Sequence, residues 1–506
     1  MTKAPQSDPT PAQVTMTLAA IAATAATPRP SGETLQDQAQ RAKRGITAQL
    51  MDPSLATGGK WQPRWLALSP DNANLAYIAS NSDLNQFAVV VRGTIDNPLD
   101  MMEDLDVGTV VPFTAGGSKD VAVSAGAMAA FTQVATASVP FGTTLTQALT
   151  NILASPATKP QPTVYVTGHS LGGCIATMLA TYLQAQPSFP KNPKFALVTF
   201  AAPTAGLQSF ADYVNSRPWS LNERYFNQYD VVPQAWVESD LLYARDHWYW
   251  DPKLPGPKAN AEVKGLLDVI IGLRKGNDYV QPGTRKPLNA DYSNHDKTLV
   301  HETTADFLGQ VAFQHANSTY LTLLGASDVA PGPVVTAVNP TAGKSGTQVT
   351  ITGSGFSKES VVVDFGPIPC KFNRDSDTQI TATVPDGTGI VDVRVTTDLG
   401  TSPAVPLGQF AYDGPPPVVV SAVSPTSGRV LTPVNITGSG FAQGATVRFK
   451  DKTVDPEKVD VKGPTLIHAT VPGQDKLDSN TVDVTVTVGV ATSPTGPHDE
   501  FTYEGL

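Results

Sequence analysis

Before Ala330, short apolar runs alternate with longer segments that are compatible with helices. The runs Phe87–Val91, Thr163–Thr167 and Phe195–Phe200 are rich in β-branched and aromatic residues, as buried strands are. Strands that alternate with helices are typical of α/β folds with a largely parallel sheet. The pattern therefore predicts an α/β domain in this part of the chain.

After Ala330 the pattern changes to short strands of period two, and it occurs twice. The segment Val335–Phe356 returns as Val420–Phe441, about 85 positions later, and the copies end alike at Gly408–Gly414 and Glu500–Gly505. Between these ends, alternating apolar and polar residues are separated by Gly, Pro, Asn and Asp turns. The repeat predicts two tandem β-sandwich domains, each with a core of its own.

The apolar segment Val14–Thr27 near the N-terminus has two interpretations. As a secretory signal it is weak, because Lys3 is the only cation before it and Asp8 intervenes. As a helix, it would have Thr10 as its cap and Pro11 in its first turn. We favour the helix, and we find no apolar run of the roughly 20 residues that span a bilayer.

Length and proline-rich joints define the predicted domains. A chain of 506 residues suggests about three domains. The joints Val329–Val335 and Asp413–Val419 would act as semi-stiff spacers. The predicted parts are an N-terminal segment (1–33), an α/β domain (34–328), a first sandwich (332–414) and a second sandwich (416–506).

Composition excludes some classes of function. The chain has 35 Lys and Arg against 45 Asp and Glu, a formal charge of -10, and its cations do not cluster as binding to a polyanion requires. A nucleic-acid partner is therefore not expected. Cys174 and Cys370 are the only cysteines and fall in different predicted domains, so no disulfide framework is expected and the redox compartment stays open.

The segment Gly168-His169-Ser170-Leu171-Gly172 has the G-x-S-x-G pattern of a nucleophile elbow. A strand-like run precedes it, and the helix-compatible run Cys174–Gln186 follows it. The glycines would leave room for a sharp turn from strand to helix. The alternative is a chance match in a glycine-containing turn, but the order of strand, elbow and helix favours Ser170 as a nucleophile.

A serine hydroxyl needs a base to become reactive, and the base needs an orienting acid. In α/β-hydrolases both follow the serine along the chain. Asp230 stands at the end of a strand-like run in Arg224–Pro233, at the sheet edge where ligands bind in open α/β folds. The alternative role for Asp230 is to anchor a turn through its side chain.

Four histidines follow Asp230 within the α/β domain. His247 lies in the aromatic, strand-like run Tyr243–Trp250, where a structural or a pocket-lining role is the default, and His295 lies in a polar stretch that is typical of an exposed loop. His301 stands at or near a predicted helix start, and His315 stands near the end of the domain. Position alone does not decide between His301 and His315.

Four blocks of the α/β domain stand in a recognisable order: Val91–Thr94, Val166–Gly173, Thr199–Ala211 and Asn227–Pro233. Taken together, they resemble the class 3 lipase family of α/β-hydrolases, in which the same blocks occur in the same order. The resemblance covers roughly residues 72–324 and implies Ser170 as nucleophile, Asp230 as acid and His315 as base. His315 matches better than His301 because the family's histidine precedes an aromatic residue, here Tyr320.

The same resemblance assigns the oxyanion hole. It implies the backbone N–H groups of Thr94 and Leu171 as donors to the tetrahedral oxyanion, which would stabilise the transition state by a few kcal/mol. Without the elbow, Thr94 would be taken for an ordinary threonine at a strand end. The sequence departs from the family at the segment Ser124–Met128 and at Ala201, Thr204 and Leu207, which concerns the shape of the pocket rather than the reaction.

The repeat resembles IPT/TIG domains, which are immunoglobulin-like modules. The resemblance rests on Asn339–Gly343, on Thr352–Phe356 and on the closing aromatic segment, and it occurs twice in register. The overall prediction is thus an α/β-hydrolase domain followed by two all-β immunoglobulin-like sandwich domains. The sequence identifies no binding chemistry in the sandwiches, so a polymer, a surface or a second copy are all open as partners.

The expected activity is the hydrolysis of carboxylic esters through an acyl-enzyme on Ser170, with acylglycerols as substrate and no metal or cofactor required. One alternative is the same mechanism on a non-lipid ester, such as a feruloyl ester or a polyester. Another is a surface-binding protein whose hydrolase domain is vestigial, although every position of the triad is filled. The domain combination favours a secreted or cell-surface location, but the N-terminus carries no convincing signal peptide.

Two segments bear on the substrate. Val110–Phe131 is apolar and glycine-rich, and is either a lid over the site or a loop followed by a core helix. The aromatic cluster Trp248–Trp250 either lines an acyl pocket or packs in the core, and the core is favoured.

Overall fold

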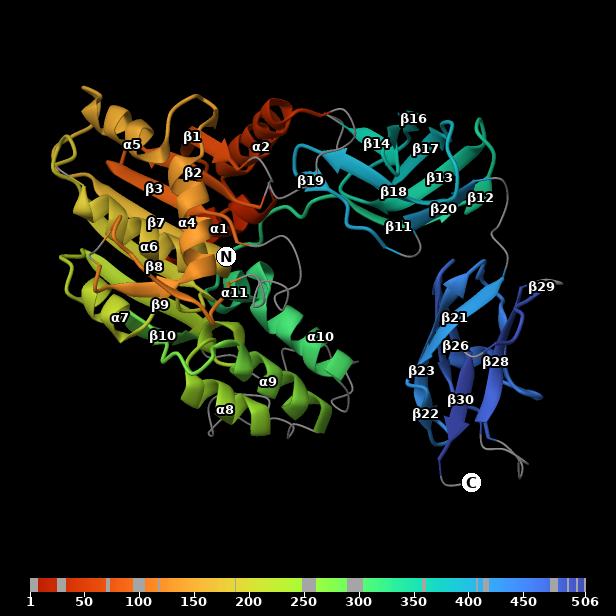
Figure 1. Cartoon of the computed structure of the whole chain (residues 1–506). Helices are drawn as coiled ribbons and strands as arrows, with labels where there is room; N and C mark the ends of the chain where they lie inside the picture. The colour runs from red at the N-terminus through yellow and green to blue at the C-terminus, as the bar shows by residue number, and fades with distance from the viewer. Residues whose placement is uncertain are drawn as a thin grey trace, which may run out of the picture. The chain divides into compact units, whose positions relative to one another are not determined.

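The computed structural model divides the chain into two compact units, with the change from one to the other between Pro331 and Gly332. Figure 1 shows the elements of both units. The structure describes residues 8–24, 33–69, 73–93, 105–116, 119–186, 188–247, 261–288, 304–356, 361–405, 408–412, 418–473, 481–488, 491–496 and 499–504.

A mixed sheet of eight described strands forms the centre of the first unit (Figure 1). Its strand order is β10-β9-β8-β7-β3-β2-β1-β6. The neighbouring strands β10, β9, β8, β7 and β3 run parallel to one another, and β2, β1 and β6 continue the sheet in antiparallel fashion. The strands are β1 (Gln62–Leu68), β2 (Leu75–Asn81), β3 (Gln86–Val91), β6 (Val139–Pro140), β7 (Thr163–His169), β8 (Lys194–Phe200), β9 (Leu221–Asn227) and β10 (Thr284–Leu288).

Two hydrophobic clusters cover the two faces of this sheet. On β3, Val89 and Val91 belong to the first cluster and Val90 belongs to the second, as the period-two alternation of a strand requires. The second cluster includes residues of α1 (Pro11–Thr24), α2 (Leu35–Leu50) and α11 (Asn317–Leu323). The first includes residues of α4 (Ala125–Thr136), α5 (Leu145–Ala154), α6 (Leu171–Ala185), α7 (Gln208–Asn215), α8 (Glu238–His247), α9 (Ala261–Leu273) and α10 (Thr304–His315). The predicted α/β fold is confirmed.

The described part of the N-terminal apolar segment lies in the helix α1, as predicted. Thr10 and Gln13 cap it reciprocally: the Gln13 N–H donates to Thr10 Oγ1 over 3.3 Å, and the Thr10 N–H donates to Gln13 Oε1 over 2.9 Å. The helix packs on the sheet, where the Tyr77 hydroxyl donates to the Leu18 carbonyl oxygen over 2.7 Å. It therefore belongs to the core of the first unit.

The segment Val110–Phe131 matches the second of its two interpretations in the residues that are described. It contains a two-stranded ribbon, β4 (Val110–Pro112) and β5 (Ala122–Ser124), followed by the first part of α4. Phe113 and Phe131 are buried and meet edge to face, with ring centroids 5.2 Å apart. These side chains hold the segment in the core.

One local prediction was wrong. The run that begins at Tyr243 was expected to be strand-like because it is aromatic, but Tyr243–His247 forms the last part of helix α8. Leu241 and Ala244 are buried three positions apart on one face of that helix, within the first hydrophobic cluster. This apolar face overrides the local strand preference. Trp248–Trp250 lie outside the described residues.

The first sandwich has two sheets, with orders β11-β13-β17-β16 and β12-β20-β18-β14-β15, and β19 pairs with β18. Val349, Ile351 and Phe365 are among its core residues, and Phe365 meets Phe410 edge to face at 5.4 Å. The strands are β11 (Val334–Asn339), β12 (Ala342–Gly343), β13 (Gln348–Ser354), β14 (Val362–Phe365), β15 (Ile368–Pro369), β16 (Lys371–Arg374), β17 (Gln379–Thr383), β18 (Ile390–Thr397), β19 (Gly400–Thr401) and β20 (Gln409–Tyr412).

The second sandwich repeats the first, strand for strand, with orders β21-β23-β27-β26 and β22-β30-β28-β24-β25, and β29 pairs with β28. Phe449 and Phe501 form the equivalent edge-to-face pair, also at 5.4 Å. The elements are β21 (Val419–Ser424), β22 (Ser427–Gly428), β23 (Pro433–Ser439), β24 (Thr446–Phe449), β25 (Lys452–Thr453), η4 (Pro456–Lys458), β26 (Val459–Gly463), β27 (Leu466–Thr470), β28 (Thr481–Val488), β29 (Ala491–Thr492) and β30 (Glu500–Tyr503). The predicted pair of sandwiches is confirmed.

A glycine in the repeated T-G-S-G-F segment explains part of the repeat. A Cβ added at Gly353 would lie 1.9 Å from the Val334 carbonyl oxygen, and one added at Gly438 would lie 1.9 Å from that of Val419. Neighbouring strands approach so closely at these points that only glycine fits.

Within the described residues, no helix combines the length and the apolar character needed to cross a bilayer.

Candidate active site

Ser170 lies in a sharp turn between β7 and α6. Its backbone has φ 59° and ψ −133°, a strained conformation for a residue with a side chain. The turn needs its glycines: a Cβ on Gly168 would lie 2.3 Å from the Gly172 carbonyl carbon, and one on Gly172 would lie 2.3 Å from the Val91 carbonyl oxygen. The Ser170 N–H donates to the Phe200 carbonyl oxygen over 2.9 Å. The G-x-S-x-G segment thus forms the predicted elbow.

Asp230 follows β9 and lies at the carboxyl ends of the parallel strands, as Ser170 does. Its side chain is fully buried. Oδ1 accepts a hydrogen bond from the Val232 N–H over 3.0 Å, and Oδ2 accepts one from the Tyr320 hydroxyl over 2.8 Å. These hydrogen bonds hold the buried carboxylate in one position.

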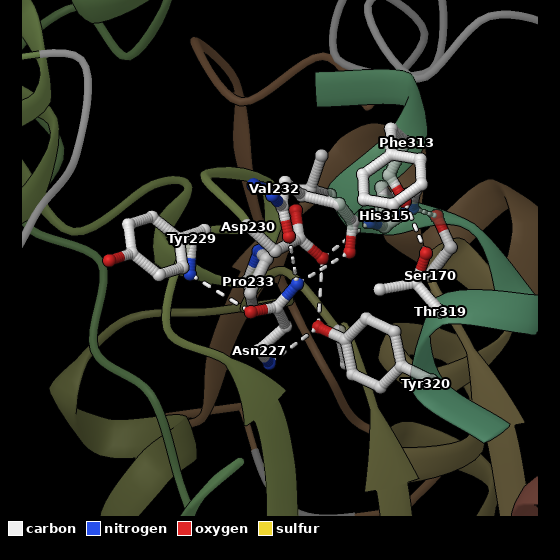
Figure 2. A network of polar contacts seen from close by, with 12 residues as sticks. Ser170, Asn227, Tyr229, Asp230, Val232, Pro233, Phe313, His315, Thr319 and Tyr320 are labelled. Carbon is white, nitrogen blue, oxygen red and sulfur yellow. Dashed lines mark hydrogen bonds and ion pairs between the residues drawn. The ribbon is translucent and has the colours of Figure 1, made fainter. Parts of the chain in front are cut away.

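His315, the last residue of α10, joins the other two side chains (Figure 2). Its Nδ1 lies 2.8 Å from Asp230 Oδ2, and its Nε2 lies 2.8 Å from Ser170 Oγ. All three side chains are buried. With the proton on Nδ1, Nε2 is free to accept the serine proton, which is the arrangement of a general base that activates a nucleophile.

Tyr320 in α11 contacts Asp230 through its hydroxyl (Figure 2). Its hydroxyl donates to Asp230 Oδ2 and accepts a hydrogen bond from the Asn227 N–H over 2.9 Å. Burial raises the pKa of the Tyr320 hydroxyl well above its usual value, and the Asp230 carboxylate raises it further. The hydroxyl therefore keeps its proton and remains a donor to the carboxylate.

His169, the residue before the serine, packs against the ring of His315. The two ring centroids are 4.7 Å apart, and the ring of Tyr320 meets His169 edge to face at 5.2 Å. Burial lowers the pKa of His169 well below its usual value, and nearby His315 lowers it further. His169 is therefore neutral and presents an uncharged face to His315.

Of the two predicted oxyanion donors, one lies within the described residues. Leu171 is the first residue of α6, so its N–H belongs to the group of N–H donors that have no carbonyl partner within the helix. The positive end of the helix dipole lies at the same point. Thr94 lies outside the described residues, as do His295 and His301. Gly93 lies against the elbow, since a Cβ added there would be 2.7 Å from the His169 carbonyl oxygen.

The structure brings together Ser170, Asp230 and His315, with Leu171 directly beside the serine. Sequence reasoning missed Asn227, Gln314 and the packing of His169. In the sequence, Asn227 is only the first residue of the block Asn227–Pro233, and Tyr320 is only the aromatic residue that helps to select His315. The hydrogen bonds that join them connect residues 87 to 93 positions apart, so no local sequence signal could have found them.

Among the described residues, no group of three or more His, Cys, Asp or Glu side chains is arranged to hold a metal ion. Cys174 in α6 is a free thiol and is buried, and burial raises its pKa to about 12. A thiol that keeps its proton is a poor nucleophile. Cys174 is therefore not suited to act as a nucleophile.

Two solved lipase structures are among those similar to this chain. The crystal structure of M37 lipase is similar over 62% of this chain and 92% of that chain, with a TM-score of 0.51 and 21% identity, a likeness in fold. The Lip2 lipase from Yarrowia lipolytica covers 44% of this chain and 72% of its own, with a TM-score of 0.31 and 18% identity.

A different likeness is found among curated proteins. Fibrocystin-L from Homo sapiens is 31% identical over 112 residues, and fibrocystin-L from Mus musculus is 31% identical over 115 residues. Each match covers 22% of this chain, which spans only 3% of the length of these relatives.

Family models match both units. Residues 88–239 match the model of the family Lipase (class 3), and residues 333–412 and 417–503 each match the IPT/TIG domain. The first match contains the elbow and Asp230, and the other two coincide with the sandwiches. The chain carries a class 3 lipase domain of α/β-hydrolase fold, followed by two IPT/TIG domains.

Proposed function

We propose that this lipase-like hydrolase cleaves carboxylic esters through an acyl-enzyme on Ser170. The observation that carries the proposal is the unbroken chain of contacts from Ser170 Oγ through His315 to Asp230, with both links at 2.8 Å. In this role Ser170 is the nucleophile, His315 the general base and Asp230 the residue that orients and stabilises the imidazole.

The reaction follows from this geometry in two halves. Ser170 Oγ attacks the ester carbonyl carbon while His315 Nε2 takes the hydroxyl proton, and the imidazolium is stabilised by Asp230 through Nδ1–H. The tetrahedral intermediate collapses as the C–O bond to the alcohol breaks and Nε2 returns the proton to that oxygen. Water then attacks the acyl-enzyme while His315 Nε2 takes its proton. The second intermediate collapses as Nε2 returns the proton to Ser170 Oγ, which releases the carboxylic acid and restores the Ser170 hydroxyl.

We propose the backbone N–H groups of Leu171 and Thr94 as the oxyanion donors. The position of Leu171 at the start of α6 supports its part of the proposal, since its N–H is available at the positive end of the helix dipole. Two such donors would together lower the barrier by a few kcal/mol.

For the substrate we propose acylglycerols, which the class 3 lipase domain supports. A series of nitrophenyl esters from acetate to palmitate tests this substrate class. We expect kcat/KM to rise with chain length and Ser170→Ala to lower kcat by at least about 1,000-fold. Hydrolysis of only the shortest esters would contradict the lipid substrate, and a wild-type protein that hydrolyses none would contradict the proposed function.

We propose that the two IPT/TIG domains, with boundaries at 332–414 and 416–506, hold the hydrolase to a polymer or surface or join copies of the chain. Each sandwich has a separate hydrophobic core, which supports a role as an independent module. Sedimentation analysis of the full chain, compared with a chain that ends at Pro331, tests self-association. Identical monomers would leave attachment to a polymer or surface as the proposed role.

A further inference from the structure

We propose that Asn227 is a positioning residue for the base: its side chain holds the end of helix α10 so that His315 meets both Ser170 and Asp230. This inference rests on the proposed function. Asn227 is the last residue of β9 and is fully buried, so it is closed off from solvent. Its importance follows from the contacts it makes in two directions.

The side-chain amide of Asn227 links the strand to α10. Nδ2 donates to the backbone carbonyl oxygen of Gln314 over 2.9 Å and to Gln314 Oε1 over 2.7 Å. Oδ1 accepts a hydrogen bond from the Tyr229 N–H over 3.0 Å, which fixes the orientation of the amide (Figure 2). Gln314 is the residue directly before His315 and is also buried.

The backbone of Asn227 links the same strand to the acid. Its carbonyl oxygen accepts the Asp230 N–H over 3.1 Å, and its N–H donates to the Tyr320 hydroxyl, which in turn donates to Asp230 Oδ2. One buried residue therefore connects the loop that carries the acid with the helix that carries the base. Movement of either relative to the other would break at least one of these bonds.

Such a link is needed because His315 ends its helix. The last four carbonyl groups of a helix have no partner within the helix, and helix ends fray where those groups are not satisfied. Two side chains supply partners for these carbonyl groups. Thr319 Oγ1 donates to the Phe313 carbonyl oxygen over 2.6 Å, and Asn227 Nδ2 donates to the Gln314 carbonyl oxygen. The Gln314 carbonyl belongs to the peptide that enters His315, so this contact fixes the backbone from which the imidazole extends.

The expected effect follows from the geometry of the base. His315 must keep two contacts of 2.8 Å at once, and a misplacement of about 1 Å costs roughly 100-fold in rate. Asn227→Asp keeps the shape of the side chain, but it replaces the donor with an oxygen that faces two acceptors of Gln314. We expect kcat to fall about 100-fold and KM to change less than about threefold.

Two further variants make the test specific. Asn227→Ser introduces no charge and is too short to reach Gln314, and we expect the same loss of kcat if position rather than charge is the cause. Asn222→Asp makes the same chemical change on the same strand, where Asn222 is partly exposed and contacts Asn215 over 3.4 Å. We expect this control to keep wild-type kcat within about twofold.

The readouts separate positioning from a merely structural role. Thermal unfolding identifies the temperature at which each variant is folded, and kcat and KM are measured below it. A folded Asn227→Asp or Asn227→Ser with wild-type kcat would overturn the proposal, even with a lowered melting temperature. Loss of kcat in the Asn222→Asp control to the same extent would also overturn it.

Proton NMR gives a measurement that does not depend on hydrolysis. We expect the wild-type protein to show the low-field resonance of the His315 Nδ1–H that is hydrogen-bonded to Asp230, and the two Asn227 variants to lose it. If the wild type shows this resonance but hydrolyses no ester, the proposed function fails while the positioning proposal is still tested. A resonance that persists unchanged in both variants would overturn the positioning role.

Discussion

At the scale of single residues, the burial of His169 gives stability a defined pH dependence. Burial and the neighbouring His315 lower its pKa below the value of about 6.5 that a histidine has in the unfolded chain. Below about pH 6.5 the unfolded state therefore binds a proton that the folded state does not, so stability is lost as the pH falls through this range. Above it, both states are neutral at His169 and the contribution is constant.

We expect His169 to contribute a slope of up to about 1.4 kcal/mol per pH unit to the free energy of unfolding below about pH 6.5. The variant His169→Asn should show a correspondingly smaller loss of stability on acidification. Urea unfolding of both proteins at a series of pH values between neutral and mildly acidic measures the two slopes. Parallel curves would show that His169 takes up its proton equally in both states.

The hydroxyl of Tyr320 provides a second prediction at this scale. Tyr320→Phe removes a donor to the buried Asp230 carboxylate and leaves the buried Asn227 N–H without its acceptor. We expect the free energy of unfolding to fall by about 1–3 kcal/mol and kcat to fall about tenfold. Tyr213→Phe is the matched control, because Tyr213 is partly exposed and lies outside the site. Equal kcat for the Tyr320→Phe variant and wild type would contradict the support of the acid by Tyr320.

At the scale of elements, the elbow depends on the close approach of α6 to β3. A Cβ on Gly172 would lie 2.3 Å from the Val91 carbonyl oxygen, and backbone cannot move aside as a flexible side chain can. We expect Gly172→Ala to destabilise the protein by about 3 kcal/mol. Gly265→Ala in α9 is the opposite case, since nothing lies within 4 Å of the added Cβ, and we expect a gain of about 0.5–1 kcal/mol.

Thermal or urea unfolding of the two glycine variants measures both signs at once. If Gly172→Ala were as stable as the wild type, the elbow would have room that the structure does not show. If Gly265→Ala were strongly destabilised, helix α9 would not have the open surface described at that position.

The elements differ in how far the sequence predicted them. The strands of the central sheet and the elbow follow from local patterns, because a buried strand needs a continuous apolar run and a sharp turn needs glycine. The end of α8 was mispredicted because an aromatic run favours a strand locally, whereas the packing of Leu241 and Ala244 decides for a helix. Asp230 could be placed from its strand end, but the choice of His315 depends on the packing of α10 and α11.

At the scale of the whole molecule, the division into two units predicts that the hydrolase domain works alone. Ser170, Asp230, His315 and their supporting contacts all lie in the first unit, which has its own hydrophobic clusters. We expect a chain that ends at Pro331 to hydrolyse a soluble nitrophenyl ester with kcat/KM within about twofold of the full chain. A large loss would show that the sandwiches take part in the reaction or in folding of the first unit.

The repeated sandwiches allow a variant whose effect is confined to one unit. Gly438→Ala would place a Cβ 1.9 Å from the Val419 carbonyl oxygen in the second sandwich. We expect it to lower the unfolding temperature of that sandwich and to leave the rate of ester hydrolysis unchanged. Calorimetry of the full chain, combined with the ester assay, separates the two effects, and a matching loss of activity would contradict independent units.

The central claim is that Ser170 is a nucleophile activated by His315, and covalent labelling with a fluorophosphonate tests it most directly. Intact-mass measurement and peptide mapping should find one adduct, on Ser170, in the wild-type protein. Ser170→Ala should give no adduct, and His315→Asn should be labelled far more slowly. A wild-type protein that forms no adduct, an adduct on another residue, or equally fast labelling of His315→Asn would contradict the claim.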